Sequence, residues 1–264
     1  MKKLLLIITL TISPILTQCD WNEDGVVDVL DVVSTVDCIM SDCWDNIGTT
    51  VMDIDGNVYQ TVAIGDQTWM AENLKVTHYN NGDDIPTGFT DDEWINLDDT
   101  ETGAFAVYDE DPANADTFGN LYNWSAVNDS RGICPEGYHV PSDEEWMELE
   151  SYLGVSELEL YQFGSRGTDQ GSQLAGNIDL WYSGELVDNP SFNSSGFVAI
   201  PGGCRPIDTW GYQYMSGLGF FWSSSGYSSI AAWGRLLSSD NSEVFRYLYS
   251  KQDGLSIHCV RDAD

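Results

Sequence analysis

Apolar and polar residues alternate between positions 53 and 70, and two glycine-containing turns interrupt the alternation. Gly56 lies in the first turn and Gly65 lies in the second. Alternating β-branched and aromatic residues are typical of half-buried strands, and glycine next to aspartate is typical of the tight turns between them. The pattern therefore predicts strand, turn and strand over 53–59 and 61–70.

A different period follows at 143–153, where apolar residues recur at helical spacing. Trp146 and Leu149 fall on one face of this predicted helix. Ser142 and Glu145 are three residues apart at its start, which is the spacing of a capping box, and an acidic first turn complements the helix dipole. We expect this to be the one clear helix between residue 51 and the C-terminus.

The C-terminal part of the chain consists of short apolar runs separated by Gly, Ser and Asn. These runs predict strands around 197–200, 220–222, 231–237, 244–249 and 256–260. One helix followed by several short strands indicates the α+β class, with an irregular antiparallel sheet.

The first eighteen residues have the composition of a secretory signal peptide. Lys2 and Lys3 precede an apolar run over 4–12, which is too short to span a bilayer. We expect residues 1–18 to be removed and the mature protein to be extracellular or at the cell surface. Residues 16–19 are also similar to a lipobox, so a lipid anchor at Cys19 is the alternative to release.

The composition narrows the classes of partner. The formal net charge is −33, which repels nucleic acid and anionic lipid. No later segment is long and apolar enough to cross a membrane. The chain nevertheless has 10 Trp, 13 Tyr and 9 Phe, so it has ample apolar surface for a folded core.

Residues 20–31 fit a twelve-residue calcium loop, in which acidic and amide oxygens alternate before a glycine at the sharp turn. Apolar residues continue at helical spacing after the loop, so a helix is expected there. The expected Ca²⁺ ligands are Asp20, Asn22, Asp24, the carbonyl group of Val26, and Asp31.

The segment over 19–45 resembles one repeat of a type I dockerin, on the run DWNEDGVVDVLDVVSTVDCI. Dockerins carry two such repeats, and this chain has one, which argues against docking to a cohesin. The resemblance implies a small calcium-clipped module, followed by a polar linker over 46–50.

Six cysteines in an exported chain are expected to form mostly disulfides, and fifteen pairings are formally possible. The histidines His78, His139 and His258 lack metal-ligand spacing. The chain has no Gly-x-Ser-x-Gly elbow, phosphate loop or dinucleotide fingerprint. The sequence therefore favours binding over catalysis.

Aromatic residues gather in the Gly- and Ser-rich segments of the C-terminal half, where rings can stack on the apolar faces of sugars. The alternative is that the rings fill the core of a fold with little regular structure. The candidate ligand-binding residues are Trp181, Trp210, Tyr212, Trp222 and Trp233.

Residues 51–264 resemble the Fibrobacter succinogenes major paralogous domain, a duplicated module of exported bacterial proteins. The matching segments are DIDGNVYQTVAIGDQTWMAENLK, DPANADTFGNLYNWSAVND, GICPEGYHVPSDEEWMELE, GFVAIPGGCR, FWSSS and IHCVRD. The resemblance implies a C-type-lectin-like fold. In that fold the first helix is tied to the last strand, which implies a Cys134–Cys259 disulfide and leaves Cys204 over.

These observations predict a secreted or cell-surface, non-catalytic binding protein that recognises a polysaccharide or a surface protein. One alternative is an oxidoreductase similar to the formylglycine-generating enzymes, which would need Cys204 and Cys259 together as free thiols. Another is an assembly subunit that docks through its dockerin-like repeat.

Overall fold

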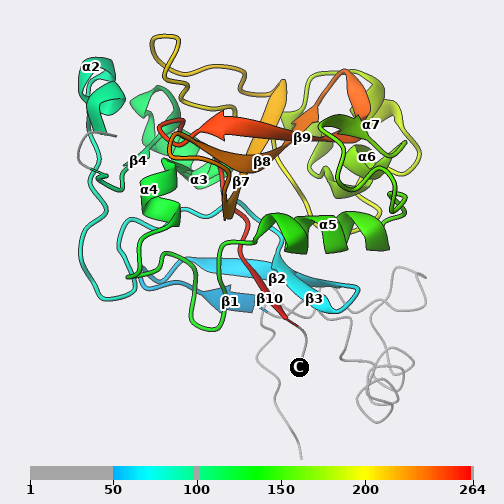
Figure 1. Cartoon of the computed structure of the whole chain (residues 1–264), viewed down its shortest axis with the longest axis horizontal. Coiled ribbons are helices and arrows are strands. Elements are labelled where there is room, and N and C mark those ends of the chain that lie inside the picture. Colours follow the sequence, from blue (N-terminus) through cyan, green and yellow to red (C-terminus); the bar gives the residue numbers. More distant parts are fainter. Residues whose placement is uncertain (1–49, 98–100, 263–264) are drawn as a thin grey trace, which may run out of the picture. The chain divides into compact units, whose positions relative to one another are not determined.

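The computed structural model describes residues 50–97 and 101–262 (Figure 1). The predicted signal peptide, the dockerin-like segment with its calcium ligands, and most of the predicted linker lie outside these residues. The strands are β1 (Thr50–Met52), β2 (Val58–Ile64), β3 (Gln67–Met70), β4 (Phe105–Ala106), β5 (Leu121–Tyr122), β6 (Gly164–Arg166), β7 (Leu218–Gly226), β8 (Ala231–Ser238), β9 (Asn241–Ser250) and β10 (Val260–Asp262). The α-helices are α2 (Asp91–Ile95), α3 (Pro112–Phe118), α4 (Trp124–Val127), α5 (Asp143–Tyr152), α6 (Gln170–Leu174) and α7 (Glu185–Asp188). The structure also contains two short 3₁₀ turns, η4 (Tyr108–Glu110) and η5 (Ile178–Leu180).

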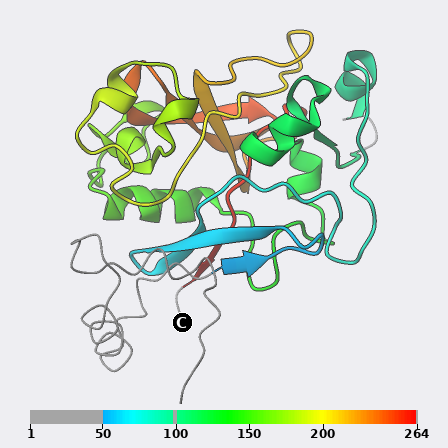
Figure 2. The ribbon, with the colours of Figure 1, turned by 180° about the vertical axis from the view of Figure 1, so that it is seen from behind.

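Two four-stranded sheets form the framework. One has the order β1-β2-β3-β10, the other has the order β6-β9-β8-β7, and neighbouring strands in both are antiparallel. Helix α5 lies between the two sheets, as the front and back views both show (Figures 1 and 2). The predicted α+β class with mostly antiparallel pairing is thus confirmed.

The turns predicted at the start of the described region are present. Gly56 and Gly65 adopt φ values of 85° and 63°, the left-handed region in which glycine is favoured. The Asp53 carboxylate closes the first turn, because it accepts hydrogen bonds from the backbone N–H of Asn57 at 2.9 Å and from the Tyr59 hydroxyl at 2.6 Å. The acidic residues here therefore stabilise a turn between β1 and β2.

Helix α5 begins as predicted. Ser142 and Glu145 form a complete capping box, in which each side chain accepts a hydrogen bond from the other residue's backbone N–H. The buried face of the helix meets both sheets in one apolar cluster. In that cluster the ring centroids of Trp69 and Trp146 are 4.9 Å apart, and Phe197 lies 5.3 Å from the first and 5.6 Å from the second.

The same buried face of α5 carries two carboxylates, Asp143 and Glu150, which face arginines of the second sheet. Arg235 donates to Asp143 at 2.7 Å and to Glu150 at 2.6 Å, and it is 1% exposed. Arg246 pairs with Asp143, and Arg166 pairs with Glu150. Burial alone would raise the pKa of Asp143, but the hydrogen bonds from the two arginines hold it below its usual value.

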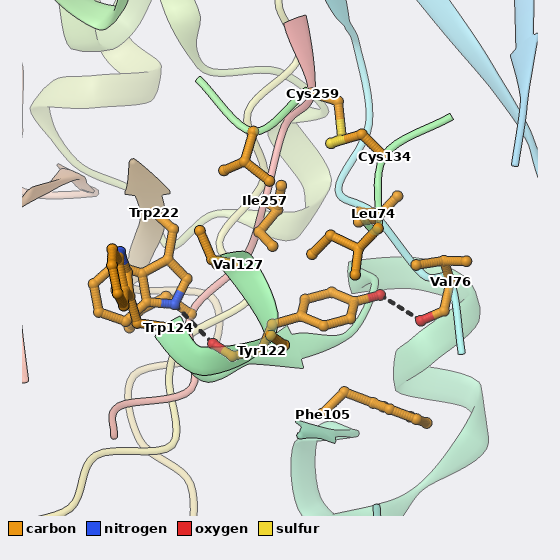
Figure 3. Packing of buried hydrophobic residues seen from close by; sticks show 14 of the residues in the cluster. Leu74, Val76, Phe105, Tyr122, Trp124, Val127, Cys134, Trp222, Ile257 and Cys259 are labelled. Atoms are coloured by element: carbon orange, nitrogen blue, oxygen red, sulfur yellow. Dashed lines mark hydrogen bonds between the residues drawn. A yellow bond between two sulfur atoms is a disulfide. The ribbon is translucent and has the colours of Figure 1, made fainter. Parts of the chain in front are cut away.

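A second core cluster contains the predicted disulfide, which is confirmed between Cys134 and Cys259 (Figure 3). Several polar atoms inside this cluster are paired. The hydroxyl of Tyr122 donates to the Val76 carbonyl at 2.7 Å, and the indole N–H of Trp222 donates to the Tyr122 carbonyl at 2.7 Å (Figure 3). The cross-link thus closes a packed and hydrogen-bonded region rather than a surface loop.

Three predicted strands require correction. Residues 53–57 of the predicted strand 53–59 form the turn between β1 and β2, so only its last two residues are extended. The segment 197–200 forms a single bridge between Ala199 and Ala175, because Val198 has a φ of 55° and interrupts the extended backbone. The segment 256–260 makes isolated bridges at Ser256 and Val260, and the regular strand begins at Val260. Several helices of four to seven residues also accompany the one predicted helix. None of the helices in the described residues has the length and apolar composition needed to cross a membrane.

Candidate functional site

The five aromatic residues proposed from the sequence differ in how far they are exposed. Trp181 and Trp222 are buried, and their indole N–H groups donate to the carbonyls of Gly176 and Tyr122. Trp233 is half-buried, with the Arg246 guanidinium 3.5 Å from its ring centroid. The expectation that Trp181 and Trp222 offer rings to a ligand is therefore corrected, because both rings are core filler.

Trp210 and Tyr212 belong to one segment, residues 206–217, which we call the aromatic loop. Trp210 is 70% exposed and Tyr214, in the same loop, is 56% exposed. Tyr182, which is 62% exposed, joins them because its backbone N–H donates to the Ser216 carbonyl at 2.8 Å. We call Tyr182, Trp210, Tyr212 and Tyr214 the aromatic surface.

The base of the aromatic loop is fixed by backbone pairing. Cys204 and Gln213 exchange two hydrogen bonds of 2.9 Å each. Gly203, just before this pair, has a φ of 64°, and a Cβ at this position would lie 2.4 Å from the Gln213 carbonyl oxygen. Ile207 is held from outside the loop, because its N–H donates to the Asp253 carboxylate at 3.0 Å. The loop is therefore preorganised.

A buried cation supports one ring of the aromatic surface. Arg205 is 3% exposed and donates to the Phe89 carbonyl at 2.7 Å and to the Asp91 carboxylate at 3.0 Å. Its guanidinium carbon lies 4.5 Å from the Trp94 ring centroid and 5.2 Å from that of Tyr212. Tyr212 is therefore held in place, while Trp210 and Tyr214 project from the loop with most of their surface exposed.

The same loop contains strained backbone. Tyr214 and Ser216 have φ values of 70° and 64°, in the left-handed region that side-chain-bearing residues rarely adopt. Ser216 is held there by a hydrogen bond from its N–H to the Pro201 carbonyl at 3.0 Å. Strain of this kind persists where the surroundings over-determine the conformation, and it clusters at ligand sites.

A cavity of about 460 Å³ lies beside the aromatic loop. Tyr214 and Asp208 line its edge, and Phe220 and Leu255 supply buried apolar surface. Among the described residues, no lysine or arginine lines this cavity. Its polar groups are carboxylates, hydroxyls and a thiol.

Burial raises the pKa of two acidic groups that line the cavity, Asp253 and Cys204. Burial, with the negative charge of Asp208 adding to it, raises the pKa of Asp253 to about 6. Burial and the nearby carboxylates of Asp253 and Asp208 also raise the pKa of the Cys204 thiol. The buried hydroxyl of Tyr249 has no hydrogen-bond partner among the described residues.

The oxidoreductase alternative needs two free thiols, which the described residues do not provide. Cys259 is bonded to Cys134, so it cannot pair with Cys204 as a reactive thiol. His258 is fully buried and burial lowers its pKa to about 3, while its ring stacks on Phe197 at 4.4 Å. No group of three or more metal-binding side chains occurs within residues 50–97 and 101–262.

Sequence reasoning identified Trp210 and Tyr212 but missed the polar half of the site. Asp253 precedes a glycine, which is a pair typical of a turn and indicates no binding role. Its contact partner Ile207 is 46 residues away in the sequence. Tyr249 lies in strand β9, and because aromatic residues are common in strands, nothing in the sequence marked it as a site residue. Turn-rich composition around Trp210 was the one available signal for the site.

Comparisons with known proteins give one match. A model of the Fibrobacter succinogenes major domain matches residues 62–261, which include the aromatic loop, the cavity and the disulfide. No curated protein and no solved structure matches the chain.

Proposed function

This chain belongs to the Fibrobacter succinogenes major domain family, and from that premise we propose that it is an exported, non-catalytic protein that binds a polysaccharide. The observation that carries the proposal is the aromatic surface: three rings, each more than half exposed, on or beside a strained and anchored loop. Our proposal retains the C-type-lectin-like fold that the family resemblance implies.

The chemistry of the site suits a sugar polymer. Exposed rings stack on the apolar faces of pyranosides, and neighbouring polar groups take the hydroxyls. The carboxylates of Asp208 and Asp253, which line the cavity, can accept hydrogen bonds from sugar hydroxyls. Because the cavity lining of described residues contains acids and no lysine or arginine, the proposed ligand is a neutral polysaccharide.

The proposal also includes export of the protein and calcium binding by its N-terminal segment. Residues 1–18 would direct secretion, and the segment 19–45 would be stabilised by Ca²⁺ bound to the oxygens of Asp20, Asn22, Asp24, Val26 and Asp31. Isothermal titration of Ca²⁺ into the mature protein tests this part. A heat of binding that Asp24→Ala abolishes is expected, and the absence of any heat in the unsubstituted protein would remove calcium from the proposal.

Affinity electrophoresis through gels containing mannan, xyloglucan, mixed-linkage β-glucan or soluble cellulose derivatives tests the binding proposal. We expect at least one neutral polysaccharide to retard the protein. Trp210→Ala and Tyr214→Ala should each weaken that retardation roughly tenfold, which corresponds to about 1.4 kcal/mol of lost stacking and burial.

Tyr161→Ala is the matched control, because Tyr161 is 74% exposed and lines a different cavity. Its retardation should equal that of the unsubstituted protein. Two results would refute the proposal: no retardation in any gel, or retardation that Trp210→Ala and Tyr214→Ala leave unchanged.

A further inference from the structure

A second hollow, which we call the α5 groove, lies between helix α5 and the turn that joins β2 to β3. Its volume is about 500 Å³. The buried side chains of Ile64, Met147 and Leu160 contribute an apolar floor. None of these residues lines the cavity beside the aromatic loop, so the two hollows are separate sites.

The rim of the α5 groove has large apolar side chains in solvent. Tyr152 and Tyr161, which line the groove, are 67% and 74% exposed, and Leu158 between them in sequence is 87% exposed. Phe163 follows and is also exposed. Single exposed apolar residues are ordinary, but a succession of them along one short segment beside an apolar hollow is typical of an interaction surface.

The groove wall is built by a close approach of two elements. Gly65 has a φ of 63°, and a Cβ at this position would lie 3.0 Å from the ring of Tyr152. The turn between β2 and β3 can therefore approach the end of α5 because it has no side chain at this point. The Tyr152 ring therefore lies against the turn and lines the groove.

Unpaired carboxylates flank the apolar floor. Glu144 and Glu148 are exposed and lie four residues apart on α5, on the same face as Tyr152, and Asp66 lies on the facing turn. Within the described part of the chain, no lysine, arginine or histidine forms an ion pair with any of these three carboxylates. Like charges this close repel one another, and a cationic partner would relieve that repulsion.

We propose that the α5 groove docks a basic amphipathic segment of a partner protein. Apolar side chains of that segment would fill the hollow above Met147 and pack on the rims, and flanking lysine or arginine side chains would pair with Glu144 and Glu148. A second copy of this chain fits poorly, because each copy has a formal net charge of −33. The same charge disfavours an anionic membrane surface.

A defined probe tests the docking proposal. It is a fluorescein-labelled peptide of about fourteen residues, with leucine at every third or fourth position and lysine elsewhere, so that it forms a basic amphipathic helix. Binding to the mature protein is followed by fluorescence anisotropy between about 0.05 M and about 0.5 M salt. A second peptide with glutamate in place of lysine reports the purely apolar contribution.

Paired variants distinguish docking in the groove from general attraction to an acidic protein. Combining Glu144→Gln with Glu148→Gln should weaken binding of the lysine peptide roughly fivefold at low salt, and Tyr161→Ala should weaken it about tenfold at every salt concentration. Glu136→Gln combined with Asp188→Asn removes the same charge from exposed positions outside the groove and should change nothing.

Three results would overturn the inference: no binding of the lysine peptide, equal weakening by the two double variants, or no effect of Tyr161→Ala. Binding to vesicles that contain phosphatidylglycerol, lost in the same groove variants, would also overturn it in favour of a membrane surface. Trp210→Ala should leave peptide binding unchanged, so failure here leaves the polysaccharide proposal standing, and the reverse also holds.

Discussion

The disulfide between Cys134 and Cys259 is expected to be the largest single contribution to stability in the described domain. It joins positions 125 residues apart, and both cysteines are almost completely buried. The informative perturbation is the double substitution Cys134→Ala with Cys259→Ala. Alanine removes the bond without introducing a buried hydroxyl group.

The magnitude follows from loop closure. In the chain-entropy treatment, a cross-link that closes about 125 residues lowers the entropy of the unfolded chain enough to stabilise the fold by about 5 kcal/mol. Removing two buried sulfur atoms adds about 1–2 kcal/mol through lost packing. A domain has about 5–15 kcal/mol of stability in total, so the double variant should be marginally folded.

Urea unfolding, followed by tryptophan fluorescence, measures the effect. The midpoint should fall sharply, and the m-value should rise because the unfolded chain loses its cross-link and exposes more surface. Cys204→Ala is the control: it removes a buried thiol but keeps the bond, so its cost should be about 1 kcal/mol with no change in m-value. A loss below about 2 kcal/mol in the double variant, or an unchanged m-value, would refute the loop-closure reasoning.

Three further predictions concern buried charge, pH and the aromatic loop. Arg235→Met should lower the free energy of unfolding, measured by urea denaturation, by about 3–5 kcal/mol. The reason is that the buried carboxylates of Asp143 and Glu150 would each lose a cationic partner. A loss under about 1 kcal/mol would contradict this prediction. Because the pKa of Asp253 is raised from 3.8 to about 6, the folded state binds its proton more tightly than the unfolded state. The free energy of unfolding should therefore fall as pH rises from 3.8 to about 6, and Asp253→Asn should remove that component from denaturation curves measured across this window; a variant with the same slope would contradict the assignment. Gly203→Ala should weaken polysaccharide retardation by displacing the aromatic loop, whereas Gly56→Ala, also at positive φ but with no atom near its Cβ position, should leave retardation intact.

Local signals in the sequence were sufficient for the elements that depend on near neighbours. The capping box of Ser142 and Glu145, and the turns at Gly56 and Gly65, involve residues a few positions apart. The capping box of Thr90 and Glu93 is equally complete, yet the five-residue helix α2 was not predicted, because no apolar period follows it. A capping box that is not followed by apolar residues at helical spacing is therefore a weak predictor of a helix.

Burial and long-range contacts could not be predicted from the sequence. The sequence predicts a strand at Trp222 and a turn-rich segment at Trp210, but it does not show that Trp222 is buried against Tyr122 while Trp210 is exposed. The disulfide pairing came from the family resemblance, because composition leaves fifteen pairings open. The polar half of the candidate site depends on Asp253 reaching Ile207, a contact that only the folded chain creates.

The positions of the arginines explain why both proposed sites are lined, among the described residues, by carboxylates and by no lysine or arginine. Four arginines, Arg166, Arg205, Arg235 and Arg246, are buried, and each pairs with a carboxylate of the fold. Cations used in this way cannot offset the acidic side chains that remain in solvent. A surface of that kind can bind a neutral polymer where exposed rings supply the energy, as on the aromatic loop, and a cationic segment where an apolar floor adjoins free carboxylates, as in the α5 groove. Four of the eight lysines and arginines in the described residues are therefore buried in ion pairs of the fold, and the selectivity proposed for the two sites follows from how few cations remain at the surface.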